Sequence, residues 1–251
     1  MMILKKETSK KENINNDNTR KNSTIELAVF VDEAAYHMYM PILDNDEDKL
    51  HNMILDYVNR IQAAFNNSSL AVFINITLIN LRIWRNQPSN LPVSDGNVVE
   101  LLSSFCTYAN SLNSPDDIDP NHWDIALYLT GVKLYENVMV KFESHYRIEK
   151  NYNITGRAYH DDACDPLFSC AIVEFRNSYE ITSSVDAVYK IGNLLGLGLT
   201  KERNSSDLER NITWPEYNRN EMETLWERKT CLRDQAKTMI SKKKNVDNSQ
   251  K

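Results

Sequence analysis

Several features that mark particular classes of protein are scarce in this sequence. Its 251 residues include only four cysteines and six glycines, and its 29 basic residues are outnumbered by 35 acidic ones. No apolar run approaches the roughly 18 residues that a membrane-spanning helix needs, because Asn75, Thr77 and Asn80 interrupt the longest one. The net charge of -6 is spread along the chain, which argues against a continuous basic surface. We therefore expect neither nucleic-acid nor membrane binding.

What is present suits one large globular domain with polar tails. Hydrophobic residues make up 41% of the chain and charged residues 25%, which is an ordinary globular balance. Residues 1–23 are rich in Lys, Asn, Glu and Ser, which predicts a disordered tail or a propeptide remnant. Residues 236–251 predict a disordered basic tail. The domain is expected to span residues 24–235.

The hydrophobic pattern predicts strands that alternate with helices. Short apolar or alternating runs bounded by polar residues indicate strands, and apolar residues at helical spacing indicate helices. The expected elements are strand 25–31, helix 47–65, strand 70–84, helix 98–112, strand 122–131, strand 171–175, helix 184–195 and helix 216–229. This order is typical of an α/β domain with a largely parallel sheet.

Cysteines and glycosylation sequons favour an extracellular protein. The cysteine count is even, and N-x-S/T sequons occur at Asn22, Asn66, Asn67, Asn75, Asn153, Asn204 and Asn211. Because asparagine is abundant, chance could supply several of these. Only four apolar residues, MMIL, precede the first lysine pair, and this run is too short for the apolar core of a signal peptide. We expect secretion by means of a signal upstream of this sequence; an intracellular protein is the alternative.

Half of the glycines lie within one short segment. Gly192, Gly196 and Gly198 fall in YKIGNLLGLGLT, and such clustering in a glycine-poor chain indicates a backbone requirement. The segment resembles the zinc-binding helix of the reprolysin and ADAMTS metalloproteases, which has the form HELGHNLGLGHD. It matches that form at every glycine and at most apolar positions, and it differs at every position that performs chemistry.

Five further segments resemble the same family, in the same order along the chain. IELAVFVDEAAY, FCTYANSLN, HWDIALYLTG, DACDPLFSCAIVEF and CLRD are similar to the family's IELVVVVDHxMF, FCxWQxxLN, HYDTAILFTG, VCDPxRSCAIVED and CLLD. Together they cover residues 25–234. The resemblance implies a metzincin-like fold, with a twisted, mostly parallel five-stranded sheet, long helices and a smaller C-terminal subdomain closed by a helix.

The residues at the zinc-motif positions do not suit the family's chemistry. In the family, three His bind zinc and a Glu beside the first activates the metal-bound water. The matching positions here are Tyr189, Asn193, Leu199 and Lys190. A phenol, an amide and a hydrocarbon do not replace imidazoles, and an ammonium adds positive charge where a cation would lie. We therefore expect neither zinc binding nor peptide hydrolysis.

A replacement metal site would need ligands from elsewhere in the chain. The five His show no pair at i, i+4 spacing, and His160 beside Asp161 and Asp162 is the one local cluster. Its other interpretation is a solvated strand end. The family's methionine-containing turn has no counterpart before Met222, which indicates a remodelled floor of the site. A metalloendopeptidase with a non-standard metal site stays open as an alternative.

The cysteines, in contrast, all match family positions. The resemblance implies disulfides between Cys106 and Cys170 and between Cys164 and Cys231. Four cysteines permit three pairings, so spacing alone does not give this connectivity. The alternative is four reduced thiols in the core.

The resemblance also implies a structural calcium ion. The matching ligands are Glu26, Asp124, the carbonyl oxygen of Cys231 and Asp234. Hard oxygen ligands of this kind suit calcium. The alternative is that Glu26 and Asp124 merely lie at strand ends.

A scaffold that keeps its structural ties but not its catalytic groups predicts a binding role. We expect a secreted, monomeric pseudoprotease that binds a protein partner through the old cleft. Besides the altered enzyme, a further alternative is a glycosylated venom or salivary component whose ancestral enzyme lost its activity. Measurements of bound metal and of peptide cleavage distinguish the pseudoprotease from a metalloendopeptidase with a non-standard metal site.

Overall fold

The computed structural model describes residues 23–70, 72–91, 94–143, 145–176, 180–198 and 212–233. Within them, the elements are β1 (Ser23–Val31), α1 (Glu33–Tyr39), α2 (Glu47–Phe65), β2 (Ile74–Ile83), α3 (Val98–Leu112), β3 (Ile125–Thr130), β4 (Glu136–Phe142), β5 (His145–Asn151), β6 (Gly156–Ala158), β7 (Cys170–Glu174), α4 (Glu180–Leu194), α5 (Tyr217–Arg228) and the 3-10 helix η2 (Thr230–Arg233). Most of both predicted tails lies outside these residues, so the domain limits stay a prediction.

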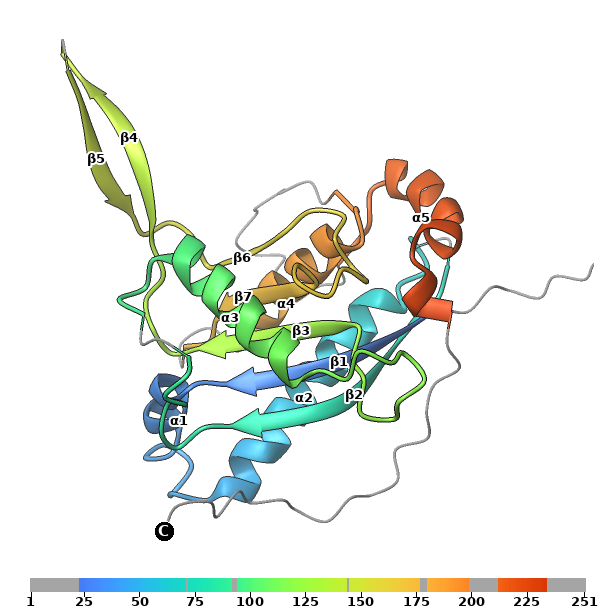
Figure 1. The fold of residues 1–251 in the computed structure, drawn as a ribbon, viewed down its shortest axis with the longest axis horizontal. Coiled ribbons are helices and arrows are strands. Elements are labelled where there is room, and N and C mark those ends of the chain that lie inside the picture. The colour runs from blue at the N-terminus through green and yellow to red at the C-terminus, as the bar shows by residue number, and fades with distance from the viewer. Residues whose placement is uncertain are drawn as a thin grey trace, which may run out of the picture.

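Five strands form one sheet in the order β2-β1-β3-β7-β6 (Figure 1). Strand β1 runs parallel to β2 and β3, and β3 runs parallel to β7. Strand β6, at one end of this order, is antiparallel to β7. The prediction of an α/β domain with a mostly parallel five-stranded sheet is confirmed.

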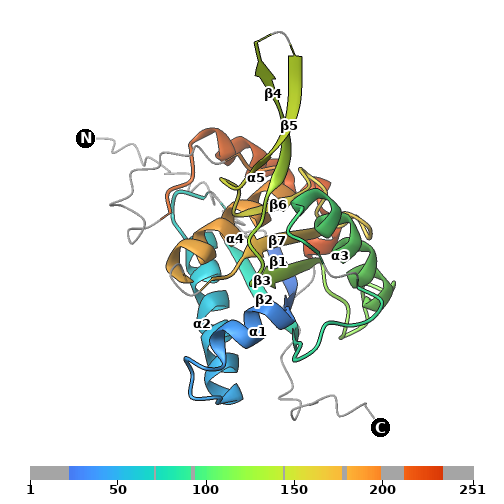
Figure 2. The same cartoon turned by 90° about the vertical axis from the view of Figure 1, so that its left-hand side faces the viewer.

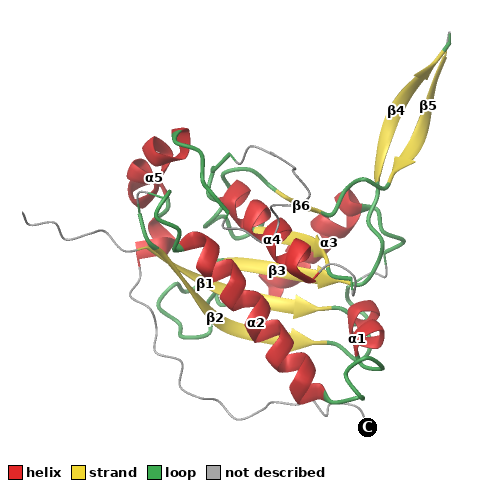
Figure 3. Cartoon of the chain, turned by 180° about the vertical axis from the view of Figure 1, so that it is seen from behind, coloured by secondary structure: helices red, strands yellow, loops and turns green. Residues whose placement is uncertain are grey.

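Helices cover both faces of this sheet (Figures 2 and 3). Helices α2 and α4 lie on one face, and α3 lies on the other. Because successive residues of a strand point to opposite faces, Leu27 and Val29 pack toward α2 and α4, whereas Ala28 and Phe30 pack toward α3. Both sets are fully buried, which explains the unbroken apolar sequence of β1. None of the described helices is long and apolar enough to cross a bilayer.

The sequence pattern missed helix α1 and the hairpin formed by β4 and β5. Helix α1 has only seven residues. In β4, Val138, Met139 and Val140 follow one another, so no strict alternation marks the strand. The hairpin turn also lacks glycine, and Glu143 adopts a positive φ of 49° there. Neither element carries the signal that sequence patterns depend on.

Two disulfides tie the sheet to its surroundings, and they are the two pairs that the resemblance implies. Cys106–Cys170 joins α3 to the start of β7. Cys164–Cys231 joins the loop before β7 to η2. The closed loops span 64 and 67 residues, and each bridge stabilises the fold by roughly 4 kcal/mol in the chain-entropy model.

Asp32 connects the end of β1 to helix α1 and strand β3. Its buried carboxylate accepts hydrogen bonds from the backbone N–H of Ala35 at 2.7 Å and of Gly131 at 3.0 Å, and from the Thr130 hydroxyl at 2.5 Å. Burial raises the pKa of Asp32 above its ordinary value, although these three donors oppose the change. The side chain therefore caps α1 and fixes the β1–β3 junction together.

Replacing Asp32 with alanine leaves three buried donors without an acceptor. We predict that Asp32→Ala lowers the free energy of unfolding by about 3 kcal/mol, measured by urea denaturation. The matched control is Asp46→Ala, which removes the exposed cap of α2 and should cost about 1 kcal/mol. Equal losses for the two variants would contradict this role of Asp32.

Candidate functional site

Helix α4 carries three of the four positions that the resemblance assigns to the zinc motif. Tyr189, Lys190 and Asn193 are all half-buried on this helix. Tyr189 and Asn193 are four residues apart, so their side chains leave the same face. The fourth position, Leu199, lies outside the described residues. The structure thus brings a phenol and an amide together on one face of α4, with an ammonium beside them.

The glycines after α4 allow close contacts with two other segments. Gly196 ends the helix with a φ of +77°, a conformation that favours glycine. A Cβ atom at Gly196 would lie 2.6 Å from Asp161 Oδ1, and one at Gly198 would lie 2.6 Å from the Tyr217 hydroxyl oxygen. Two of the three clustered glycines, Gly196 and Gly198, are therefore explained by the loop before β7 on one side and by α5 on the other.

Asp161 holds the end of α4 and the end of α5 together. Its backbone N–H donates to the Asn193 carbonyl at 2.8 Å. Its carboxylate accepts from Arg228 at 2.7 and 2.9 Å, and it lies 3.1 Å from the Lys229 ammonium, which also donates to the Asp161 carbonyl. Burial acts to raise the pKa of Asp161, but Lys229 and Arg228 outweigh burial and lower the pKa.

Helix α5 is also fastened to the segment that follows α4. The fully buried Asn218 side chain accepts from the Gly198 N–H at 3.1 Å and donates to the Gly198 carbonyl at 2.6 Å. This two-way contact and the Asp161 ion pairs leave little freedom between α4 and α5. Of the predicted His160 cluster, His160 is exposed and the Asp161 carboxylate is held by two cations.

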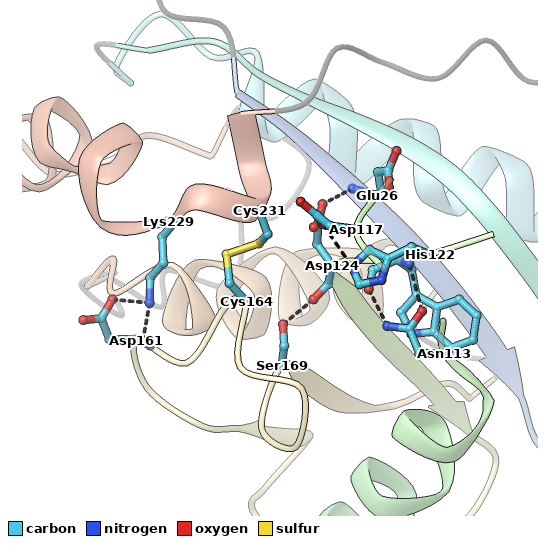
Figure 4. Close-up of a disulfide and its surroundings, with 11 residues drawn as sticks. Glu26, Asn113, Asp117, His122, Asp124, Asp161, Cys164, Ser169, Lys229 and Cys231 are labelled. Carbon is cyan, nitrogen blue, oxygen red and sulfur yellow. Dashed lines mark hydrogen bonds and ion pairs between the residues drawn. A yellow bond between two sulfur atoms is a disulfide. The ribbon is translucent and has the colours of Figure 1, made fainter. Parts of the chain in front are cut away.

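A second group of polar side chains lies near the start of β3, on the other side of the Cys164–Cys231 disulfide from Asp161 (Figure 4). Asp124 N–H donates to the Glu26 carbonyl at 2.8 Å, and Glu26 N–H donates to the Asp124 carboxylate at 2.7 Å. Both residues are buried, with 1% and 4% of their surface exposed. The structure therefore brings Glu26 and Asp124 together, as the calcium hypothesis requires.

Asp117 and His122 join Asp124 in this group. The ligand atoms of the three side chains lie within 4.8 Å of one another. His122 Nδ1 is 2.7 Å from the Ser114 carbonyl, and because a carbonyl only accepts, Nδ1 carries a proton. The other ring nitrogen, Nε2, lies 3.3 Å from the Asp117 carboxylate. Two lone pairs would face each other there unless a proton or a cation lies between them.

The remaining predicted calcium ligands are only partly described. Cys231 lies in η2, which packs against β1 close to Glu26 (Figure 4), whereas Asp234 lies outside the described residues. Sequence reasoning missed Asp117 and His122. The sequence SPDDIDPNHWD could have indicated them, because it places several acidic residues and a histidine within a few positions of Asp124, just before strand β3 begins.

The predicted glycosylation sites differ in accessibility. Asn66, Asn75 and Asn153 are exposed, and Asn67 is half-buried. The other candidates, Asn22, Asn204 and Asn211, lie outside the described residues. Glycosylation at any of them stays a prediction.

The sheet, its covering helices and the motif helix are compatible with a metalloprotease-like domain, and relatives of the chain support this class. It is 26% identical over 179 residues to "A disintegrin and metalloproteinase with thrombospondin motifs adt-1" of Caenorhabditis elegans, covering 69% of this chain and 11% of that protein. It is 24% identical over 148 residues to "A disintegrin and metalloproteinase with thrombospondin motifs 20" of Homo sapiens, covering 59% of this chain and 7% of that protein. It is 26% identical over 148 residues to "A disintegrin and metalloproteinase with thrombospondin motifs 4" of Rattus norvegicus, covering 59% of this chain and 21% of that protein.

These relatives confirm the resemblance that the sequence motifs carry. The chain holds a domain similar to the ADAMTS and reprolysin metalloprotease domain, and the matched segment spans only about a tenth of adt-1. No family model matches the chain. Among solved structures, a chain described as "Structure of a chaperone-substrate complex" gives a TM-score of 0.45 at 13% identity, covering 73% of this chain and 26% of that one.

The ion pairs of Asp161 predict a specific pH dependence. Because its pKa is lowered in the folded protein, the stability that it contributes is present above its unfolded pKa of about 3.9 and is lost as the pH falls through the folded value. We predict that Asp161→Asn lowers the free energy of unfolding by about 1 kcal/mol or less at pH 6, since these pairs are partly solvent-screened. The difference from wild type should shrink below about pH 4.

Chemical denaturation of both proteins at pH 6 and pH 3 measures this difference. Glu221→Gln is the matched control, because Glu221 pairs with the same Arg228 at 3.2 Å and is more exposed. It should have the smaller effect. A difference for Asp161→Asn that does not change with pH would show that the ion pairs are not its cause.

Proposed function

We propose that this chain is a secreted ADAMTS-like metalloprotease homologue with a metzincin-like fold that does not hydrolyse peptides and acts by binding a protein partner. The observation that carries the proposal is the chemistry of α4. Where the relatives' motif has imidazoles and a carboxylate, this helix has Tyr189, Lys190 and Asn193. The order of the sheet and the position of α4 against it support the metzincin-like fold.

None of these α4 groups suits the family's reaction. Zinc sites take deprotonated nitrogen, sulfur or carboxylate ligands, whereas Asn193 offers a neutral amide and Tyr189 a phenol, a group whose reference pKa in model peptides is near 10. The Lys190 ammonium donates hydrogen bonds only, so it cannot accept a proton from water. When four cooperating positions change together, the loss of activity is close to complete.

The partner surface that we propose runs along β6. This strand ends the sheet order, so its outer edge pairs with no other described strand. An extended segment of a partner can add to such an edge through backbone hydrogen bonds. Residues 159 and 160, which follow β6, lead directly to Asp161 at the end of α4. A partner on this edge would therefore also meet the altered motif positions.

The proposed structural ion is calcium, held by Glu26, Asp117, Asp124, the Cys231 carbonyl and Asp234. The carboxylates of Asp117 and Asp124 lie within 4.8 Å of each other and repel, and a divalent cation with oxygen ligands would offset this repulsion. His122 is a nitrogen donor, so we assign it to positioning Asp117 rather than to the ion. The two disulfides favour an oxidising, extracellular location.

The second candidate is a metalloendopeptidase with a non-standard metal site. The observation in its favour is the group Asp117, His122 and Asp124, which mixes carboxylate and imidazole ligands. This group lies in the segment between α3 and β3, beside Asn113 (Figure 4), and not on the motif helix. We therefore favour a structural ion there.

Zinc content and peptide cleavage separate these proposals. We predict that the purified chain, loaded with zinc and then dialysed, keeps less than one zinc per molecule by elemental analysis and cleaves no member of a peptide library. The variant Tyr189→His, Lys190→Glu, Asn193→His, Leu199→His should retain more zinc than wild type. Stoichiometric zinc with cleavage by the wild type would overturn the proposal of an inactive homologue.

Photo-crosslinking with the same purified chain tests whether it binds a protein partner. A photo-crosslinking residue at the exposed His160 should give a discrete crosslinked protein from extracellular fluid. The same residue at the exposed Asp56 of α2 should not. Equal crosslinking at both positions, or none at His160, would count against partner binding beside β6.

Calcium should stabilise the folded chain. We predict that the melting temperature rises with added calcium and falls with a chelator, because an ion bound only by the folded state stabilises it by mass action. Asp117→Asn should remove most of this response. Asp116→Asn, an exposed acid of the same loop outside the group, should keep it. An unchanged response in Asp117→Asn would place the ion elsewhere.

A further inference from the structure

The β4–β5 hairpin projects from the body of the molecule as a two-stranded arm (Figures 1 and 3). The two strands pair in register from Glu136 opposite Asn151 to Phe142 opposite His145. Among the described strands, each pairs only with the other. Both outer edges of the arm therefore present backbone groups that can pair with a further strand.

The base of the arm is fixed to the domain. Tyr135 donates to the Asp95 carboxylate at 2.6 Å, and the Lys150 ammonium lies 3.8 Å from the centre of the Tyr135 ring and 3.3 Å from Asp95. Glu136 pairs with Arg157 of β6 at 3.3 Å. These contacts hold the arm in one orientation, which lowers the entropy cost of using it for recognition.

The two faces of the arm differ. On one face, Arg147 forms an ion pair with Glu149 and lies 5.2 Å from the centre of the Phe142 ring. On the other face, Met139 and Ile148 are cross-strand partners and are each 71% exposed, and Tyr146 beside them is 64% exposed. An apolar row on a fixed, unpaired arm indicates an interaction surface.

We propose that this arm pairs with the arm of a second copy of the chain, with β5 antiparallel to β5 about a two-fold axis at Ile148. In this register, Ile148 faces Ile148 of the second copy. Arg147 faces Glu149 of the second copy, and Glu149 faces its Arg147, so two ion pairs form at once. Tyr146 faces Lys150, so no like charges meet at this position.

Charge selects this register over its neighbours. Moving the two-fold axis by one residue would place Arg147 opposite Arg147, or Glu149 opposite Glu149, and like charges directly opposite destabilise a strand pair. Registers centred between two residues would oppose side chains from different faces, which the pleat does not allow. Strand β4 offers no comparable ion pairs, since Val138 would face Val140 there.

The same pairing extends the apolar row. The order of strands becomes β4, β5, β5 and β4, so Met139 and Ile148 of one copy continue into Ile148 and Met139 of the other. The contact is small beside the roughly 1,200 Å² of stable interfaces. The sequence led us to expect a monomer, and this pairing makes the chain a weak, reversible dimer instead.

Charge reversal tests the pairing sharply. Wild type should show a concentration-dependent dimer by sedimentation velocity at low salt. Arg147→Glu and Glu149→Arg should each weaken self-association by about tenfold or more, because each places like charges opposite one another. An equimolar mixture of the two variants should dimerise again. The mixture does not restore the ion pair within either chain, so recovery reports the contact between chains.

The control variant is Lys141→Glu, which changes the charge of the same arm by the same amount as Arg147→Glu but lies on β4. It should dimerise like wild type. Circular dichroism checks that every variant is folded. A wild type that stays monomeric at all concentrations, or a mixture that associates no better than its components, would overturn the proposal. This result does not depend on whether the chain binds zinc or a partner at β6.

Discussion

The structure depends on the loop between β6 and β7, because both the motif helix and the C-terminal segment are attached to it. Asp161 and Ala163 donate backbone hydrogen bonds to the carbonyls of Asn193 and Leu194 at the end of α4. Three residues beyond Asp161, Cys164 is bonded to Cys231 of η2. The loop thus fixes α4 against the C-terminal segment through two hydrogen bonds, a disulfide and the ion pairs of Asp161.

This attachment accounts for the combination of kept and lost features. The end of α4 is held by backbone hydrogen bonds from Asp161 and Ala163, so its position does not require a bound zinc ion. Replacement of the motif residues by Tyr189, Lys190 and Asn193 can then leave the fold intact, while the Cys164–Cys231 disulfide joins the same loop to η2, close to the acidic group at Glu26. The proposal of a binding protein follows from this separation between scaffold and chemistry.

Much of this arrangement could be predicted from sequence, and the reasons for the rest are physical. Buried strands such as β1 and the amphipathic helix α2 follow from hydrophobic periodicity, and the family motifs indicated the disulfide pairs. The β4–β5 arm was missed because it is solvent-exposed on both faces and turns without glycine. Asp117 and His122 were missed because a loop brings them to Asp124, and spacing alone carries no information about loop conformation.

We propose that the segment between Tyr189 and Gly198 is a structural element and not a metal site. Crystals grown with excess zinc and measured at the zinc absorption edge would show whether this is so. We predict no anomalous density beside Tyr189 and Asn193, with Asp161 still bound to Arg228 and Lys229. A zinc peak coordinated by α4 side chains, with those ion pairs broken, would contradict it.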